Sequence, residues 1–341
     1  MTTEPARIFL APTMDGSPPV LPFMAKAPEY FDFSGFVIVD NVAQADFVAL
    51  PYMPRHISPE FRAYAERTTK WADSVGKKTI AFIAGDYAYK LHIDGAIVFK
   101  ASAFRHGLRS GEIVSVSFTD DPYHGKAFTP HGKSERPIVS FCGFAEMTSP
   151  LTWGKYFLTN TALDVSAAIT GKPHLTAHKR GIYFRRKAMS LLEKDPRIET
   201  RFILRKTFFG QAPKEETERH RQEYLENMST ADFALAPRGD GNYSRRFFRA
   251  LSMGVVPILI DTDMVLPLEK ILDYSRFIVR VPHTELSTLG ERIVSLYNTL
   301  GEEEFKNMQR AAREAFLMYL RQDSFYGHAF SLLKAQGPEA L

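Results

Sequence analysis

Short apolar runs alternate with helix-like segments along most of this chain. Such alternation is typical of parallel sheets covered by helices, the doubly wound α/β class. The runs expected to form strands span 7–11, 36–40, 46–50, 78–83, 96–99, 113–118, 137–142, 201–204, 232–236, 255–260 and 277–281. The spacing of apolar residues predicts helices over 59–75, 178–194, 214–228, 244–253, 265–272, 302–320 and 324–334.

One stretch, 119–136, interrupts the alternation. It holds Pro122, Gly125, Pro130 and Gly132 with few large aliphatic residues, so it is expected to be a linker. A chain of 341 residues is long enough for about two domains. We therefore expect a first Rossmann-like domain over 1–130, a second over 131–300, a cleft between them, and C-terminal helices over 301–341 that pack back on the first domain.

Composition excludes several classes of protein. Cys142 is the only cysteine, so neither a disulfide framework nor a cysteine zinc cage is possible. No apolar run approaches the length of a membrane span, and the first residues lack the pattern of a signal peptide. A formal charge of +4 without a dense basic arm does not favour nucleic acid. A cytoplasmic protein is expected.

The most informative stretch is 231–254, where an apolar strand runs into a glycine-containing turn that opens a helix. Gly239 and Gly241 permit close backbone approach, and Asn242 or Ser244 can cap the helix. Gly254 is placed to end it. The free N–H groups at such a helix start suit a phosphate.

Four arginines surround this helix start: Arg238, Arg245, Arg246 and Arg249. A cation at the positive end of a helix costs about 0.3–1 kcal/mol when exposed, and Arg245 and Arg249 form a repulsive i,i+4 pair. A bound phosphate or diphosphate would relieve these costs together; solvation, or pairing with acids from elsewhere, is the alternative. The turn 239–244 lies too late in the chain for a dinucleotide fingerprint, and 74–79 lacks the first glycine of a P-loop.

A family resemblance rests on the same region. The segments 236–239, 244–258 and 266–267, together with Asp263, resemble the C-terminal signature of exostosin-type glycosyltransferases, and 271–282 is similar to its continuation. Upstream, 45–52, 118–122 and 136–143 resemble earlier segments of the family more loosely. The resemblance spans about residues 40 to 285.

The resemblance implies a GT-B architecture in which the second domain holds a nucleotide-sugar donor. It also implies inverting transfer without an essential metal or other cofactor. Relatives usually carry Glu where this chain has Arg249, and that acid handles the donor ribose. Arginine has only donors, so the identity of the donor is open. The donor-binding candidates are Arg238, Gly239, Gly241, Asn242, Ser244, Arg245, Arg249, Asp263, Gly143, Arg180 and Arg185.

Catalytic and metal candidates come from strand ends. An inverting transfer needs a base, which we expect from the first domain: Asp86 after the strand 78–83, or Asp15 after the first strand, although either can be a turn residue. The motif 261–263 resembles the metal motif of another glycosyltransferase fold, but arginines already supply the cationic charge, so no metal is expected. Asp263 is instead expected near the donor sugar or at the start of the helix 265–272.

The sequence thus predicts a glycosyltransferase of surface polysaccharide synthesis. Its expected partners are a UDP- or GDP-linked sugar and an oligosaccharide or lipid-linked glycan, with peripheral contact at the inner membrane face through basic residues and no nucleic acid. Two alternatives stay open. One is a non-catalytic nucleotide- or glycan-binding exostosin-like protein, motivated by Arg249, and the other is a binder of nucleic acid or anionic surfaces, motivated by a pI near 8.9.

Overall fold

The computed structural model describes residues 4–124, 126–145, 150–205 and 214–341. Its first half forms a six-stranded parallel sheet in the order β2-β1-β3-β4-β5-β6. The strands are β1 (Ala6–Leu10), β2 (Phe36–Val39), β3 (Phe47–Ala49), β4 (Lys78–Ile83), β5 (Ala96–Lys100) and β6 (Glu112–Val114). Their side chains are mostly buried on both faces, as expected for a parallel sheet covered by helices.

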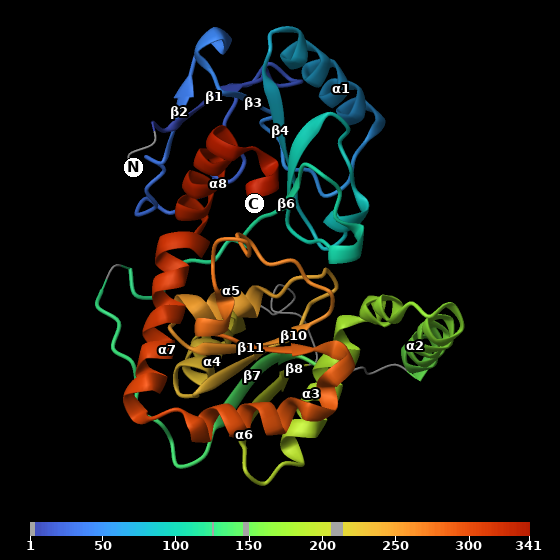
Figure 1. The fold of residues 1–341 in the computed structure, drawn as a ribbon, viewed down its shortest axis with the longest axis vertical. Helices are drawn as coiled ribbons and strands as arrows, with labels where there is room; N and C mark the ends of the chain where they lie inside the picture. Colours follow the sequence, from blue (N-terminus) through green and yellow to red (C-terminus); the bar gives the residue numbers. More distant parts are fainter. Residues whose placement is uncertain (1–3, 125, 146–149, 206–213) are drawn as a thin grey trace.

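The second half forms a five-stranded parallel sheet in the order β11-β10-β9-β7-β8. Its strands are β7 (Ile138–Phe144), β8 (Glu199–Arg205), β9 (Phe233–Ala236), β10 (Val256–Asp261) and β11 (Val279–Pro282). The two sheets lie one above the other along the long axis of the molecule, each with helices against it (Figure 1). The predicted α/β class and its two-domain, GT-B-like arrangement are confirmed.

Eight α-helices are found among the described residues. They are α1 (Pro59–Ser74), α2 (Pro150–Thr170), α3 (Gly181–Glu193), α4 (Lys214–Ser229), α5 (Arg245–Ser252), α6 (Leu289–Thr299), α7 (Glu302–Ala315) and α8 (Gln322–Gln336). Local signals explain their starts: Ser58 caps α1 by accepting from the Phe61 N–H, and a proline follows at the first helical position.

Two helix predictions differ from the structure. The helix expected at 265–272 is wrong, because these residues form turns in which Leu268 has a positive φ of 55° that a right-handed helix cannot contain. The sequence analysis also did not predict α2. This helix has apolar residues around most of its circumference, so it lacks the one-sided pattern by which helices are identified.

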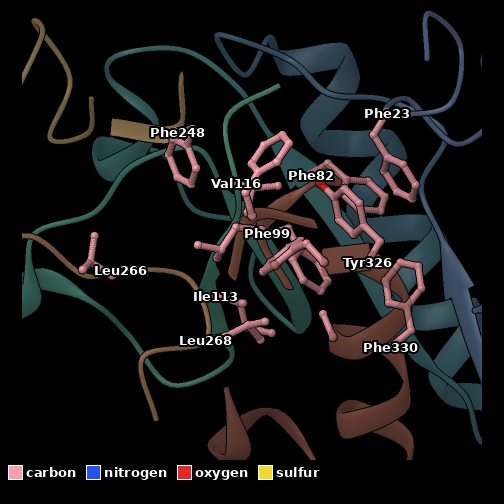
Figure 2. Packing of buried hydrophobic residues seen from close by; sticks show 14 of the residues in the cluster. Phe23, Phe82, Phe99, Ile113, Val116, Phe248, Leu266, Leu268, Tyr326 and Phe330 are labelled. Atoms are coloured by element: carbon pink, nitrogen blue, oxygen red, sulfur yellow. The ribbon is translucent and has the colours of Figure 1, made fainter. Parts of the chain in front are cut away.

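The C-terminal helix α8 packs against the first sheet, with contacts to β1 and β2. Tyr326 on α8 stacks on Phe23 with ring centroids 3.6 Å apart, and Phe330 meets Phe99 edge to face (Figure 2). The same buried cluster continues into the second domain through Phe248 on α5. Apolar packing therefore spans both halves of the chain and holds the sheets in a defined relation.

The segment between the sheets is fixed to the second domain and to α7. Asp121 forms a buried ion pair with Arg313 on α7 at 2.8 Å, and Arg313 also donates to the Ser252 carbonyl. Breaking such a buried pair leaves an uncompensated charge, so it constrains the segment strongly. The described helices include none long and apolar enough to cross a bilayer.

Candidate active site

A cavity of about 820 Å³ lies between the two domains. Its first-domain wall includes Arg55, Gly85 and Asp86, which follow the carboxyl ends of β3 and β4. Its second-domain wall is formed by residues that follow β7 and β9 and by the start of α5: Gly143, Arg185, Gly239, Asp240, Tyr243, Ser244, Arg245 and Arg246. Ligands of open α/β sheets bind at this edge, outside the carboxyl ends of the strands.

The turn before α5 is shaped by its glycines. The Gly239 N–H donates to the Tyr243 carbonyl at 3.1 Å, which closes the turn. Gly241 lies so close to the first domain that a Cβ there would approach the Asp86 backbone at 2.8 Å. Ser244 occupies the N-cap position of α5 without a side-chain capping bond, and Gly254, with a φ of +68°, follows the end of the helix. The sequence-predicted strand–turn–helix unit is therefore present.

Arg245 and Arg246 bring two guanidinium groups to this helix start. Arg245 is exposed and lines the cavity, and no hydrogen bond or ion pair to another described residue is found for it. Arg246 is only 8% exposed; it donates to the Cys142 carbonyl and lies between the Phe141 and Tyr224 rings. Its second terminal nitrogen is buried without a partner among the described residues. This buried nitrogen can donate a further hydrogen bond.

Two further arginines, Arg185 and Arg55, also line the cavity. Arg185, on α3, donates to the carbonyls of Phe144 and Arg238, and burial lowers its pKa to about 10, so it remains cationic at neutral pH. Arg55 reaches the cavity from the first domain and was not among the sequence candidates. It follows a proline in a loop without any recognisable motif, so the sequence carried no signal for it.

Of the two candidate bases, the structure places Asp86 in the cavity and Asp15 outside it. Asp86 lies beside Tyr243, whose pKa is raised to about 12 by burial and by the Asp86 charge. Asp15 is exposed in the loop after β1, where hydrogen bonds from Ser17 hold its carboxylate and lower its pKa. The expectation that Asp15 faces the cleft is therefore not met.

Two predicted donor-binding residues fix the domains to each other. Arg238 is buried; it donates to the carbonyls of Ala177 and Asp240, and its guanidinium lies over the Phe104 ring of the first domain. Asn242 donates to the Ala103 carbonyl at 2.9 Å and accepts from Thr262. Both side chains are engaged by protein contacts, and donor binding by Arg238 and Asn242 stays a prediction.

Asp263 and Arg180 also lie away from the cavity lining. The Asp263 carboxylate accepts from the His106 backbone N–H at 3.1 Å and pairs with the His106 ring. Residues 264–272, directly after Asp263, form no helix, so Asp263 caps none, in contrast to the prediction. Arg180 is the exposed residue that precedes α3. Neither residue is brought to the cavity.

Arg249 lies in a smaller adjoining cavity of about 270 Å³, which shares Gly143 and Arg245 with the larger one. Arg249 pairs with the Asp120 carboxylate and donates to its carbonyl at 3.0 Å. Burial opposes ionisation of Asp120, but the contacts of Arg249 and the charge of Arg221 together lower its pKa below the usual range. The repulsion between Arg245 and Arg249 is thus offset by an acid that lies 129 positions away from Arg249.

The motif 261–263 has its carboxylates engaged by the protein. Asp261 accepts from Arg280 and from the Met264 N–H, each at 2.8 Å. No group of three His, Cys, Asp or Glu side chains arranged to hold a metal ion is found in the described part of the chain. The larger cavity is lined by arginines together with the carboxylates of Asp86 and Asp240.

A histidine contact joins the domains beside the cavity. The His178 ring lies 4.2 Å from the Phe104 ring, and its Nε2 atom is 3.2 Å from Nε2 of His106. Burial, followed by the charges of His106 and Arg238, lowers the pKa of His178 from 6.5 to about 4. The folded protein therefore holds this ring neutral, whereas the unfolded chain takes up a proton near pH 6.5.

We expect the protein to lose stability as the pH falls from about 6.5 towards 4, because protonation of His178 then favours the unfolded chain. The ring is half-buried, so screening reduces the effect to about 1 kcal/mol. Melting temperatures measured at pH 7.5 and 5.0 should fall by less in His178→Gln than in the wild type. An identical decrease in both proteins would contradict this role of His178.

Comparisons with known proteins agree with the geometry. Residues 180–296 match the family described as the Exostosin GT47 domain. Exostosin-1 homolog of Caenorhabditis elegans is 29% identical over 101 residues, 30% of this chain and 25% of that protein. Exostosin-1 of Drosophila melanogaster is 29% identical over 132 residues, which are 36% of this chain and 17% of that protein. A probable glucuronosyltransferase of Oryza sativa subsp. japonica is 31% identical over 77 residues, which are 23% of this chain and 18% of that protein.

The chain therefore spans about a quarter or less of the length of these curated relatives. Among solved structures, a glycosyltransferase from Rickettsia africae aligns over 98% of this chain and 99% of its own, at 13% identity and a TM-score of 0.36. The matched family segment begins just before α3 and ends within α6, so it contains Arg185, the turn before α5, and α5 itself.

Proposed function

Because the chain carries an exostosin-type GT47 domain over residues 180–296, we propose that it transfers a sugar from a nucleotide-sugar donor to a glycan acceptor. The observation that carries this proposal is the pair Arg245 and Arg246 at the start of α5. One offers an unengaged guanidinium to the cavity, and the other offers a buried nitrogen without a partner among the described residues. Both lie within the matched family segment.

In the proposed complex, the donor diphosphate lies against the N-terminus of α5. Its backbone N–H groups and helix dipole favour negative charge, and Arg245 and Arg246 add charged hydrogen bonds. A cavity of about 820 Å³ accommodates a nucleotide sugar. As the glycosidic bond to the diphosphate breaks, negative charge grows on the leaving nucleoside diphosphate, and the arginines stabilise it. They do so without a metal.

The acceptor enters from the first-domain side, and Asp86 takes the proton from its attacking hydroxyl. Asp86 belongs to the first-domain wall and Arg245 and Arg246 to the second-domain wall, so we propose that the acceptor and the leaving group are held by different domains, as inverting transfer needs. Tyr243 is a poor alternative base, since a phenol with a pKa of about 12 is protonated at neutral pH. The neighbouring charge of Asp86 contributes to keeping it so.

We place the nucleoside of the donor towards the smaller cavity beside Arg249. There, the Asp120 carboxylate pairs with Arg249, and Arg249 stands where relatives usually carry a glutamate. A carboxylate oxygen accepts a hydrogen bond from a ribose hydroxyl, which arginine cannot do. Asp120, which belongs to the linker, can therefore bind the ribose in place of the usual acid. A UDP- or GDP-linked sugar remains the proposed donor. An oligosaccharide or lipid-linked glycan in surface polysaccharide synthesis remains the proposed acceptor.

A thermal-shift panel of UDP, GDP, CMP and their common sugars, with and without Mg²⁺, tests donor binding. A ligand at about 100 times its Kd should add about 2.7 kcal/mol, or a rise of about 2–4 °C in melting temperature for a chain of this size. We expect one nucleotide class to stand out without metal. A response that requires Mg²⁺ would contradict the proposed metal independence, and a flat panel would contradict donor binding.

A second candidate is a nucleotide- or glycan-binding protein without transferase activity. Arg249, engaged by Asp120 at the position where the resemblance expects an acid, favours it. Such a protein would respond in the thermal-shift panel but release no nucleoside diphosphate from the bound nucleotide sugar with any glycan acceptor. Release of nucleoside diphosphate with any glycan acceptor would rule out this non-catalytic candidate.

A further inference from the structure

The helix α2 leaves a row of large apolar side chains in water. Leu151, Leu158, Val165 and Ile169 are 69%, 69%, 51% and 80% exposed. They recur at intervals of seven, seven and four residues, so they share one face of the helix. Single exposed apolar residues are ordinary on protein surfaces, but a continuous row marks an interaction site. We call these four residues the α2 stripe.

The opposite face of α2 attaches the helix to the protein. Tyr156, Asn160 and Ala167, at intervals of four and seven residues, are buried, and Leu163 between them is half-buried. This face packs on the turn Pro173–His178 (η4) that leads into α3. The buried face already attaches α2 to the rest of the protein. The α2 stripe is therefore a second face of the helix, and it is exposed. Figure 1 shows α2 projecting from the side of the second domain, away from the first sheet.

The chain segment that contains the α2 stripe is basic. The segment 150–187 contains seven Lys or Arg and one Asp, a net charge of +6, whereas the whole chain carries +4. The rest of the chain is therefore net negative. The single acid, Asp164, is already paired with Lys179 at 2.6 Å. Lys155, on α2, and Lys172, just after it, are exposed, so their charge is available to a partner.

We propose that α2 binds the surface of an anionic lipid bilayer. The α2 stripe would lie among the acyl chains just below the headgroups, and the exposed basic residues would contact lipid phosphates. The helix has 21 residues, about 30 Å, and it lies along the surface because it is not apolar enough to cross. A second copy of the chain would bring two +6 segments together, whereas an anionic bilayer complements both the apolar row and the charge.

Flotation with vesicles tests this proposal on the full chain without donor or acceptor, so its outcome does not depend on glycosyl transfer. The wild type should float with vesicles of phosphatidylcholine and phosphatidylglycerol but not with phosphatidylcholine alone. The double variant Leu158→Glu/Ile169→Glu should bind at least about tenfold more weakly. Lys155→Glu and Lys172→Glu should each weaken binding by about fivefold or more.

Met318→Glu is the matched control, because Met318 is 54% exposed outside α2. It should float like the wild type, and circular dichroism should show that every variant is folded. Equal flotation of the wild type and the α2 double variant would overturn the proposal, as would no flotation of the wild type. A dimer in sedimentation that the double variant abolishes, without vesicle binding, would assign the α2 stripe to a second copy instead.

Discussion

Replacing Arg245 by alanine should lower turnover by about 10²- to 10³-fold, the usual loss when one donor to a developing negative charge is removed. Arg245 lies at the start of α5, lines both cavities and has no hydrogen bond or ion pair with another described residue, so its guanidinium is available to the donor. The assay is release of nucleoside diphosphate from the nucleotide sugar that the thermal-shift panel selects.

The Arg245→Lys variant separates charge from geometry. Lysine keeps the positive charge but not the planar fork that binds two phosphate oxygens, so we expect partial activity between the wild type and Arg245→Ala. Arg276→Ala is the matched control, since Arg276 is an exposed arginine of the same domain outside both cavities. Unchanged turnover in Arg245→Ala would remove the central support for the proposed donor site.

Structural features that depend on residues close together in the sequence were predictable. The glycine turn, the start of α5 after Ser244 and its end at Gly254 depend on residues within one helix length of each other, and the structure contains all three, although the Ser244 side chain makes no capping bond. The alternation of apolar strands with helices likewise predicted both parallel sheets. Local backbone preferences and burial decide these elements, and both are properties of neighbouring residues.

Features that depend on the other domain were not predictable. Arg238 and Asn242 resembled donor ligands in the sequence, yet Arg238 lies over Phe104 and Asn242 donates to Ala103, more than a hundred positions away. Arg55 was missed for the same reason, because its place in the cavity is set by how the domains meet. A lone sequence shows which side chains can bind an anion but not which of them the fold already engages.

Helix prediction failed where tertiary structure overrides the local pattern. The apolar residues at 265–272 have helical spacing, but they fill the space between the domains as turns, with Leu266 and Leu268 in the core (Figure 2). The reverse holds for α2, whose exposed face is apolar. Exposed apolar residues on this helix blur the one-sided pattern from which helices are predicted.

Replacing Asp86 by asparagine should lower turnover by about 10²- to 10⁴-fold while leaving the donor Kd unchanged within about twofold. Asparagine has nearly the same shape, so the close contact with Gly241 is kept, but its amide cannot take up a proton at neutral pH. Calorimetry with the selected nucleotide sugar measures the Kd, and release of nucleoside diphosphate in the presence of acceptor measures turnover.

Two further aspartates show whether the loss belongs to Asp86. Asp94→Asn is the control, because this side chain is 90% exposed outside the cavity lining and should leave both quantities unchanged. Asp15→Asn tests the rival base, which the structure holds by hydrogen bonds from Ser17 outside the cavity. If Asp15→Asn lost turnover and Asp86→Asn kept it, the acceptor would enter along the loop after β1 instead. Loss only in Asp86→Asn, with donor binding intact, would place proton transfer on the first-domain wall, whereas Arg245 and Arg246 hold the donor from the second domain.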